Sequence, residues 1–207
     1  MKRVIFSIFI ALVLCSSLFA EINLPKEHRV KNFDSGCCVW CAVENLGNIH
    51  GILSLKGIAK HRHENYGNKK KWVEGSYIAD QFGNLIRVNG PHWVIVNEAP
   101  GTPERVIEEF TRLKVDYNMQ LHGNYDVKIL NKSMDENLGC AVGLRNFPCD
   151  GCYHMVTLTH IDNDKVVFVD NNGDLPRVEK TREWFNNHWT GYTIVVRIPK
   201  ELPKYYK

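Results

Sequence analysis

A cysteine placed where a helix begins is the first residue of this chain that could act as a nucleophile. Cys38 opens a stretch, 38–49, whose apolar residues recur at helical spacing, and Gly51 follows as a stop signal. The unpaired N–H groups and the positive dipole end of a helix start favour the thiolate form of a cysteine. Because the thiolate is the nucleophilic form, this position suits covalent hydrolysis. A structural cysteine or a disulfide partner is the alternative.

A histidine and a carboxylate that could serve this thiol lie together further along the chain. His154 begins a β-rich segment (154–161), and a second one (166–169) ends directly before Asp170 and Asn171. The turn residues between the two segments predict an antiparallel hairpin, which would bring His154 close to Asp170. A general-base histidine needs a partner on one ring nitrogen to fix its tautomer, and either Asp170 or Asn171 could supply it.

Helical patterns dominate the first half of the chain and strand patterns the second, which predicts an α+β fold. The cysteine then belongs to the helical half and the histidine to the β half. Residues 21–33 are expected to form an extended lead-in, and Lys69-Lys70-Lys71 a solvated loop. The expected helices are 38–49, 53–65, 74–86, one beginning at Thr102-Pro103, and 183–188; the expected strands are 115–121, 140–144, 154–161, 166–169 and 192–198.

Length and composition are those of one globular domain. The chain has 207 residues, of which 44% are hydrophobic and 24% charged, and this excludes a disordered chain. A net charge of +3 is too small to indicate nucleic-acid binding by itself. Seven cysteines are the unusual feature, too few for a disulfide-scaffold peptide. One of them, Cys140, lies in an apolar strand and is expected to be a buried free thiol.

Residues 1–20 have the pattern of a secretory signal peptide. Two basic residues precede an apolar run (4–14), and small residues lead to a cleavage site after Ala20. The run is shorter than the roughly 20 apolar residues that span a bilayer, so an uncleaved membrane anchor is the less favoured alternative. Cleavage also removes Cys15. The sequence thus predicts a secreted or periplasmic mature domain at 21–207, without stable membrane insertion and with its six other cysteines in an oxidising compartment.

The order of these parts resembles the papain-like cysteine peptidases, and within them the bacteriocin-processing (double-glycine) peptidases. The resemblance lies in Cys38 at a helix start, the segment 154–158 (His-Met-Val-Thr-Leu), and Asp170 after the hairpin. Residues 139–144 are similar to the strand that precedes the histidine loop in that family, and 183–192 are similar to its closing segment.

The resemblance covers about residues 30–198 and implies a single papain-like domain with cysteine peptidase or related amide hydrolase activity. It implies that Cys38 is the nucleophile and that His154 is the base and then the acid. It also implies that Asp170 orients the histidine and that Asn32 is an oxyanion-hole donor in place of the family's glutamine. The expected substrate is a peptide, a protein or a cell-envelope amide, and no cofactor is implied.

Departures from the family pattern leave other assignments open. The family has Gly-Pro or Trp directly after the nucleophile, where this chain has Val39, and Pro after the aspartate, where it has Asn171. The neighbouring Cys37 therefore stays a second candidate for the nucleophile. The Asn32 amide is one methylene shorter than glutamine, which leaves a catalytically inactive papain-like binding module as an alternative function.

Two CxxC pairs support a competing interpretation without catalysis. The pairs are Cys38-x-x-Cys41 and Cys149-x-x-Cys152, a spacing that suits a tetrahedral zinc site. Cys38 cannot be both a closed-site zinc ligand and a free nucleophile, so a zinc-stabilised structural domain is an alternative to the peptidase. In an exported protein the same cysteines, with Cys37 in place of Cys38, could instead form disulfides, whose pairing the sequence leaves open.

Other polar clusters are expected to have no chemical role. His61-Arg62-His63 is expected to be a solvated helix face rather than a metal site. Asp162 and Asp164 lack the full spacing of an EF-hand calcium loop. Substrate specificity is expected to reside in loops such as those of residues 64–101.

Overall fold

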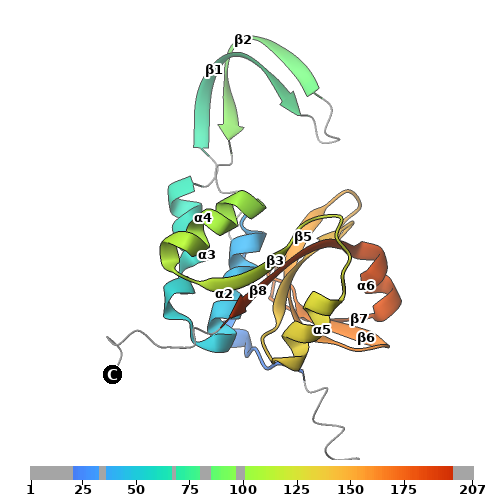
Figure 1. Cartoon of the computed structure of the whole chain (residues 1–207). Helices are drawn as coiled ribbons and strands as arrows, with labels where there is room; N and C mark the ends of the chain where they lie inside the picture. The colour runs from blue at the N-terminus through green and yellow to red at the C-terminus, as the bar shows by residue number, and fades with distance from the viewer. Residues whose placement is uncertain (1–20, 33–35, 67–68, 80–84, 97–100, 198–207) are drawn as a thin grey trace, which may run out of the picture.

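The computed structural model describes residues 21–32, 36–66, 69–79, 85–96 and 101–197 (Figure 1). The predicted signal peptide lies outside these residues. Within them, no helix has the length and apolarity needed to cross a membrane. The helices are η1 (Lys26–His28), α2 (Cys38–His50), η2 (Leu53–Leu55), α3 (Ile58–Tyr66), α4 (Pro103–Leu113), α5 (Lys128–Asp135) and α6 (Arg182–His188). The strands are β1 (Lys69–Ala79), β2 (Leu85–Val96), β3 (Asp116–Gln120), β4 (Cys140–Arg145), β5 (Tyr153–Ile161), β6 (Lys165–Val169), β7 (Arg177–Thr181) and β8 (Trp189–Arg197).

An antiparallel sheet with helices on both faces forms the main body, in agreement with the predicted α+β class. Its six strands run in the order β3-β8-β4-β5-β6-β7, and successive residues of a strand face opposite sides. Ala141 and Met155 belong to the apolar core that α2 shares, whereas Val142 and Val156 belong to the core that α5 and α6 share. Figure 1 shows α2, α3 and α4 on one side of the sheet, with α5 and α6 on the other.

Helix α2 carries the candidate nucleophile, and its position follows from its sequence. Gly51 ends the helix in the left-handed conformation, and its N–H donates to the Gly47 carbonyl. Trp40 and Val43 are fully buried, and burying one such side chain contributes roughly 1.5–3 kcal/mol. Because α2 packs against β5, this burial holds the start of the helix, at Cys38, near the strand that carries the candidate base.

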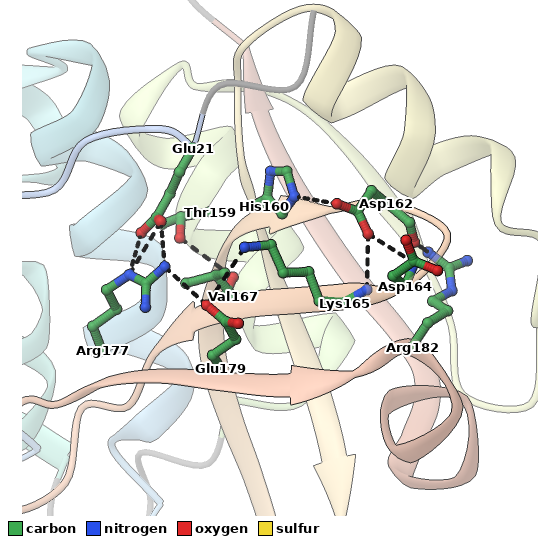
Figure 2. Close-up of polar contacts among 10 residues, drawn as sticks. All are labelled: Glu21, Thr159, His160, Asp162, Asp164, Lys165, Val167, Arg177, Glu179 and Arg182. Atoms are coloured by element: carbon green, nitrogen blue, oxygen red, sulfur yellow. Dashed lines mark hydrogen bonds and ion pairs between the residues drawn. The ribbon is translucent and has the colours of Figure 1, made fainter. Parts of the chain in front are cut away.

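The predicted hairpin at 154–169 is confirmed as strands β5 and β6. The two strands pair antiparallel, and β6 ends one residue before Asp170. Asp162 closes the turn, since its Oδ1 accepts hydrogen bonds of 2.8 Å from the backbone N–H groups of Asp164 and Lys165 (Figure 2). Such a side-chain turn fixes the register of a hairpin, so the start of β5 and the end of β6 lie side by side.

The N-terminal lead-in is attached to the body from its first described residue. The Ile22 N–H donates to the Thr159 carbonyl at 2.9 Å. The Arg177 guanidinium pairs with the Glu21 carboxylate at 2.6 Å (Figure 2). Through these contacts Glu21 and Ile22 are held against the sheet.

The sequence-based predictions of a helix at 74–86 and a loop at 69–71 were wrong for the described residues; 80–84 lie outside them. Strands β1 and β2 form an antiparallel hairpin there, with an irregularity between Glu74 and Ser76. The reason is that β-branched and aromatic residues recur on both sides of the break, and each segment finds its hydrogen-bond partners only in the other. Figure 1 shows this hairpin extending away from the body beyond α3 and α4.

The expectation of a solvated helix face at 61–63 was wrong for Arg62. Its side chain is buried, and its guanidinium lies 3.7 Å from the Glu109 carboxylate of α4. The same guanidinium stacks over the ring of Trp40 at 4.7 Å and of Tyr66 at 4.2 Å. Arginine rather than lysine suits such a site because its planar cation stacks on aromatic rings. This contact ties α3 and α4 to the helix that carries Cys38.

Candidate active site

The Cys38 thiol and the His154 imidazole are in hydrogen-bond contact. Cys38 is the first residue of α2 and His154 the second of β5, so the contact joins the helical half of the fold to the β half. The thiol sulfur also accepts from the backbone N–H groups of Val39 and Met155. The first N–H groups of a helix have no intrahelical partner, which is why the start of α2 can offer one to the sulfur.

The other nitrogen of the imidazole contacts Asp170, the carboxylate that the sequence placed after the hairpin. His154 Nε2 lies 2.8 Å from Asp170 Oδ1, and both residues are buried. This contact leaves Nδ1 as the ring nitrogen available to the thiol. The three side chains therefore form a continuous chain of hydrogen bonds from Cys38 through His154 to Asp170.

These contacts favour a thiolate beside a protonated imidazole. Burial alone would raise the pKa of the Cys38 thiol, but the hydrogen bond and charge of His154 and the two backbone N–H groups lower it below its ordinary value. Burial alone would lower the pKa of His154, but its hydrogen bonds to Asp170 and Cys38 and their charges raise it to about 9. Between the two titrations the pair is ionised, and the sulfur is nucleophilic without any further proton transfer.

A small apolar pocket of about 120 Å³ opens beside the thiol. Two glycines keep it open. A Cβ on Gly143 would lie 2.7 Å from Thr190 Oγ1, and one on Gly101 would lie 2.1 Å from Val39 Cβ. Side chains at these two positions would therefore fill the space next to the sulfur. The lining residues are Cys38, Val39, Gly101, His122, Gly143, Leu144, Tyr153, His154, Met155, Thr190 and Tyr192.

Asn32 does not have the surroundings expected of an oxyanion-hole donor. Its Nδ2 donates to Asn172 Oδ1 at 3.1 Å, and its Oδ1 is buried with no partner in the described part of the chain. Its backbone N–H donates to the Asn171 carbonyl at 2.7 Å. Asn32 is not among the residues that line the pocket. The Asn32 amide is thus directed at the loop after β6.

Asn171 has a position that the sequence did not predict. The sequence left open whether Asp170 or Asn171 contacts the histidine, and in the structure it is Asp170. The Asn171 amide instead donates to the backbone carbonyls of Cys38, at 2.9 Å, and Met155, at 3.0 Å. A polar residue directly after a candidate aspartate was the only available signal, and it did not distinguish the two assignments.

The two CxxC pairs do not come together as a zinc site. Cys149 and Cys152 form a disulfide with each other, with their Cα atoms 5.3 Å apart, so neither sulfur is a thiolate that could hold zinc. No group of three or more candidate metal ligands occurs among the described residues. Because Cys149 and Cys152 are bonded to each other, neither forms a disulfide with Cys37 or Cys41. The proposed four-cysteine zinc set, which includes Cys38, is therefore wrong for this structure.

The remaining cysteines differ in their surroundings from Cys38. Cys140 is fully buried in β4, as predicted, and burial raises the pKa of its thiol to about 12. Cys37 is 1% exposed, and its sulfur lies 4.0 Å from His63 Nδ1. Cys41 is also buried, and its thiol contacts the Lys31 carbonyl. Cys38 alone of these four lines the pocket beside His154.

The segment directly before the disulfide packs against the imidazole of His154. The ring of Phe147 lies 6.1 Å from that of His154, and the Asn146 N–H donates to the Cys152 carbonyl at 2.7 Å. We predict that the variant Cys149→Ser/Cys152→Ser will fold but lose about threefold to tenfold in kcat/KM, because a freer Phe147 no longer restrains the ring. Kinetics of the oxidised wild type and the variant, without reductant, check this; equal kcat/KM values would contradict it.

Comparisons with known proteins give no sequence match and a weak structural similarity. No family model matches this sequence, and no curated protein matches it. Among solved structures, the peptidase domain of Streptococcus mutans ComA is similar, with 15% sequence identity and a TM-score of 0.37. The match covers 48% of this chain and 76% of that one. The likeness is a distant one in fold, so the chemistry of this chain has to be judged from its own side chains.

Proposed function

We propose that this protein is a cysteine peptidase or a related amide hydrolase. One observation carries the proposal: the His154 ring contacts the Cys38 thiol on one nitrogen and the Asp170 carboxylate on the other. A nucleophile, a base and a group that orients the base are the parts that covalent hydrolysis of an amide requires. The lowered pKa of the Cys38 thiol and the pocket beside it support the same assignment.

The geometry supports a two-step reaction. The Cys38 thiolate attacks the amide carbonyl. The resulting oxyanion accepts a hydrogen bond from the backbone N–H of Cys38 at the start of α2. The protonated His154 then gives its proton to the departing amine, which leaves an acyl group on the sulfur. Water attacks this thioester while His154 takes up a proton, and the acid product leaves with the thiolate restored. Asp170 keeps the ring oriented in both steps.

We further propose that the protein acts outside the cytoplasm, as a secreted or periplasmic enzyme on peptide or cell-envelope amide bonds. Two features support this: the signal-peptide pattern of residues 1–20 and the disulfide between Cys149 and Cys152. Disulfides persist in oxidising compartments and are rare in the cytosol. The contact of Glu21 with Arg177 is consistent with a mature chain that begins at that residue.

A second candidate function is a binding module of the same fold without hydrolytic activity. The observation that favours it is the direction of the Asn32 amide, which donates to Asn172. Loss of one oxyanion donor costs about a hundredfold to a thousandfold in kcat in other hydrolases. In this case the pocket would still bind acyl groups, and the Cys38 thiolate would still react with small electrophiles.

The two functions are separated by incubating the protein with a peptide library and identifying new termini by mass spectrometry. If the protein is a peptidase, new termini appear with the wild type and disappear with Cys38→Ala, whose cleavage rate is expected to be lower by on the order of a thousandfold or more. Cys37→Ala is the matched control and is expected to keep the activity, because the Cys37 thiol is buried away from the pocket. Cleavage that survives in Cys38→Ala would contradict the proposal that the protein is a cysteine peptidase. Alkylation of Cys38 without any cleavage supports the binding module.

A further inference from the structure

The Asn171 side chain joins the two elements that meet at the active site. Its single NH₂ group donates to the carbonyl of Cys38 on α2 and to the carbonyl of Met155 on β5. These two carbonyls belong to the residue that carries the thiol and to the residue directly after His154. Asn171 is fully buried, so water does not compete for either hydrogen bond.

The orientation of this amide is determined by its surroundings. An amide carries two donors on nitrogen and only acceptors on oxygen. The carbonyl oxygens of Cys38 and Met155 face Nδ2 of Asn171. If the amide were flipped, its oxygen would face both of them and be repelled by both. The flipped arrangement of Asn171 is therefore excluded on chemical grounds, although such flips are otherwise common for this residue type.

The Asn171 side chain also lowers the stability of the fold, and this argues for a role beyond packing. Its Oδ1 is buried and has no partner among the residues that the structure describes. A buried acceptor without a partner destabilises a protein, whereas an apolar side chain of similar shape does not. The benefit of the amide must then lie in what its two donors hold together.

We propose that Asn171 is a positioning residue, which sets the distance between the Cys38 thiol and the His154 ring by holding their main chains together. The inference rests on the proposed function, since it concerns the same pair. The backbone N–H of Met155 also reaches the Cys38 sulfur. Asn171 therefore fixes both the carbonyl side of Cys38 and the peptide unit that supports its thiolate.

Asn45 provides a matched control, because it is another buried asparagine that links α2 to β5. Its Nδ2 donates to Thr157 Oγ1 at 3.1 Å, and its Oδ1 accepts the Val30 N–H at 2.8 Å. Asn45 is fully buried as well, and it lies two helical turns from the thiol. Substitutions at both asparagines are expected to lower the thermal midpoint of unfolding, so stability does not distinguish them.

The readout is the rate at which iodoacetamide alkylates Cys38, measured by peptide mass spectrometry across pH. In wild type the thiolate displaces iodide and forms a thioether, at a rate that follows the thiolate fraction. In Asn171→Ala and Asn171→Asp we expect the pH midpoint to rise by about one unit, which is a tenfold slower reaction below it. Asn45→Ala and Asn45→Asp are expected to keep the wild-type midpoint.

Each outcome has a separate meaning. A wild-type midpoint at the ordinary value for a cysteine would overturn the proposed function and leave nothing for Asn171 to position. A low wild-type midpoint that is unchanged in both Asn171 variants would overturn only the positioning role. An equal rise in the Asn45 variants would do the same, because it would show a general effect of loosening α2 on β5. Both the Ala and the Asp variant are measured at each asparagine, so that the test can be completed if only one of the two folds.

Discussion

His154→Ala is expected to abolish hydrolysis and to slow alkylation of Cys38 near neutral pH by on the order of a hundredfold. The imidazole contributes both a hydrogen bond and a charge to the Cys38 thiolate. Without it, burial of the thiol remains and the pKa of Cys38 rises. Acyl transfer also loses the one base that contacts the sulfur within the part of the chain that the structure describes. The measurement is kcat/KM together with the iodoacetamide rate, both at about pH 7.

His160→Ala is the matched control for this experiment. His160 lies on the same strand, is also buried, and is paired with a carboxylate, Asp162, at 2.9 Å (Figure 2). Its loss is expected to affect stability but not the reactivity of Cys38. The assignment of His154 as the base fails if His154→Ala keeps wild-type alkylation kinetics, or if the two variants lose activity equally.

Asp170→Asn is expected to move the alkaline limit of activity to lower pH. Burial alone would lower the pKa of His154, and the Asp170 carboxylate is a main cause of its rise to about 9. Removing the charge therefore lowers the pKa of His154. Because the active pair needs a protonated imidazole, the variant is expected to lose activity at a lower pH than the wild type as the pH rises. At about pH 8 we expect kcat/KM to fall at least tenfold, and near pH 6 to fall less.

Asp162→Asn tests whether this shift is specific, because it neutralises the carboxylate of the other histidine–aspartate pair. Its alkaline limit is expected to match that of wild type. Profiles of kcat/KM from about pH 5 to pH 10 check both variants. An unchanged alkaline limit in Asp170→Asn would show that Asp170 only orients the ring and does not set its charge.

The helix and the hairpin that position the candidate site were predicted correctly from local sequence signals. The helical spacing after Cys38 and the stop at Gly51 define α2, and the turn around Asp162 defines the hairpin of β5 and β6. Because the side chains of His154 and Asp170 lie at the open end of that hairpin, their contact follows from its register. Burial of the apolar face of α2 then leaves the helix start beside the histidine.

The parts that depend on non-local partners were not predictable in this way. Each strand of the β1–β2 hairpin forms its backbone hydrogen bonds with the other, so the sequence of either segment alone does not predict a strand. The direction of the Asn32 amide depends on Asn172, which is remote in sequence. The Asn171 amide bonds two backbone carbonyls, and such contacts leave no pattern in the spacing of side chains.

The central claim is that His154 is protonated and paired with a Cys38 thiolate in the resting protein. The most direct test is the ¹⁵N NMR titration of the His154 ring, assigned by comparison with His154→Ala. The account predicts that both ring nitrogens keep their protons up to about pH 9, where the pKa of His154 lies. A ring that loses its proton at or below the ordinary histidine value of about 6.5 would contradict it.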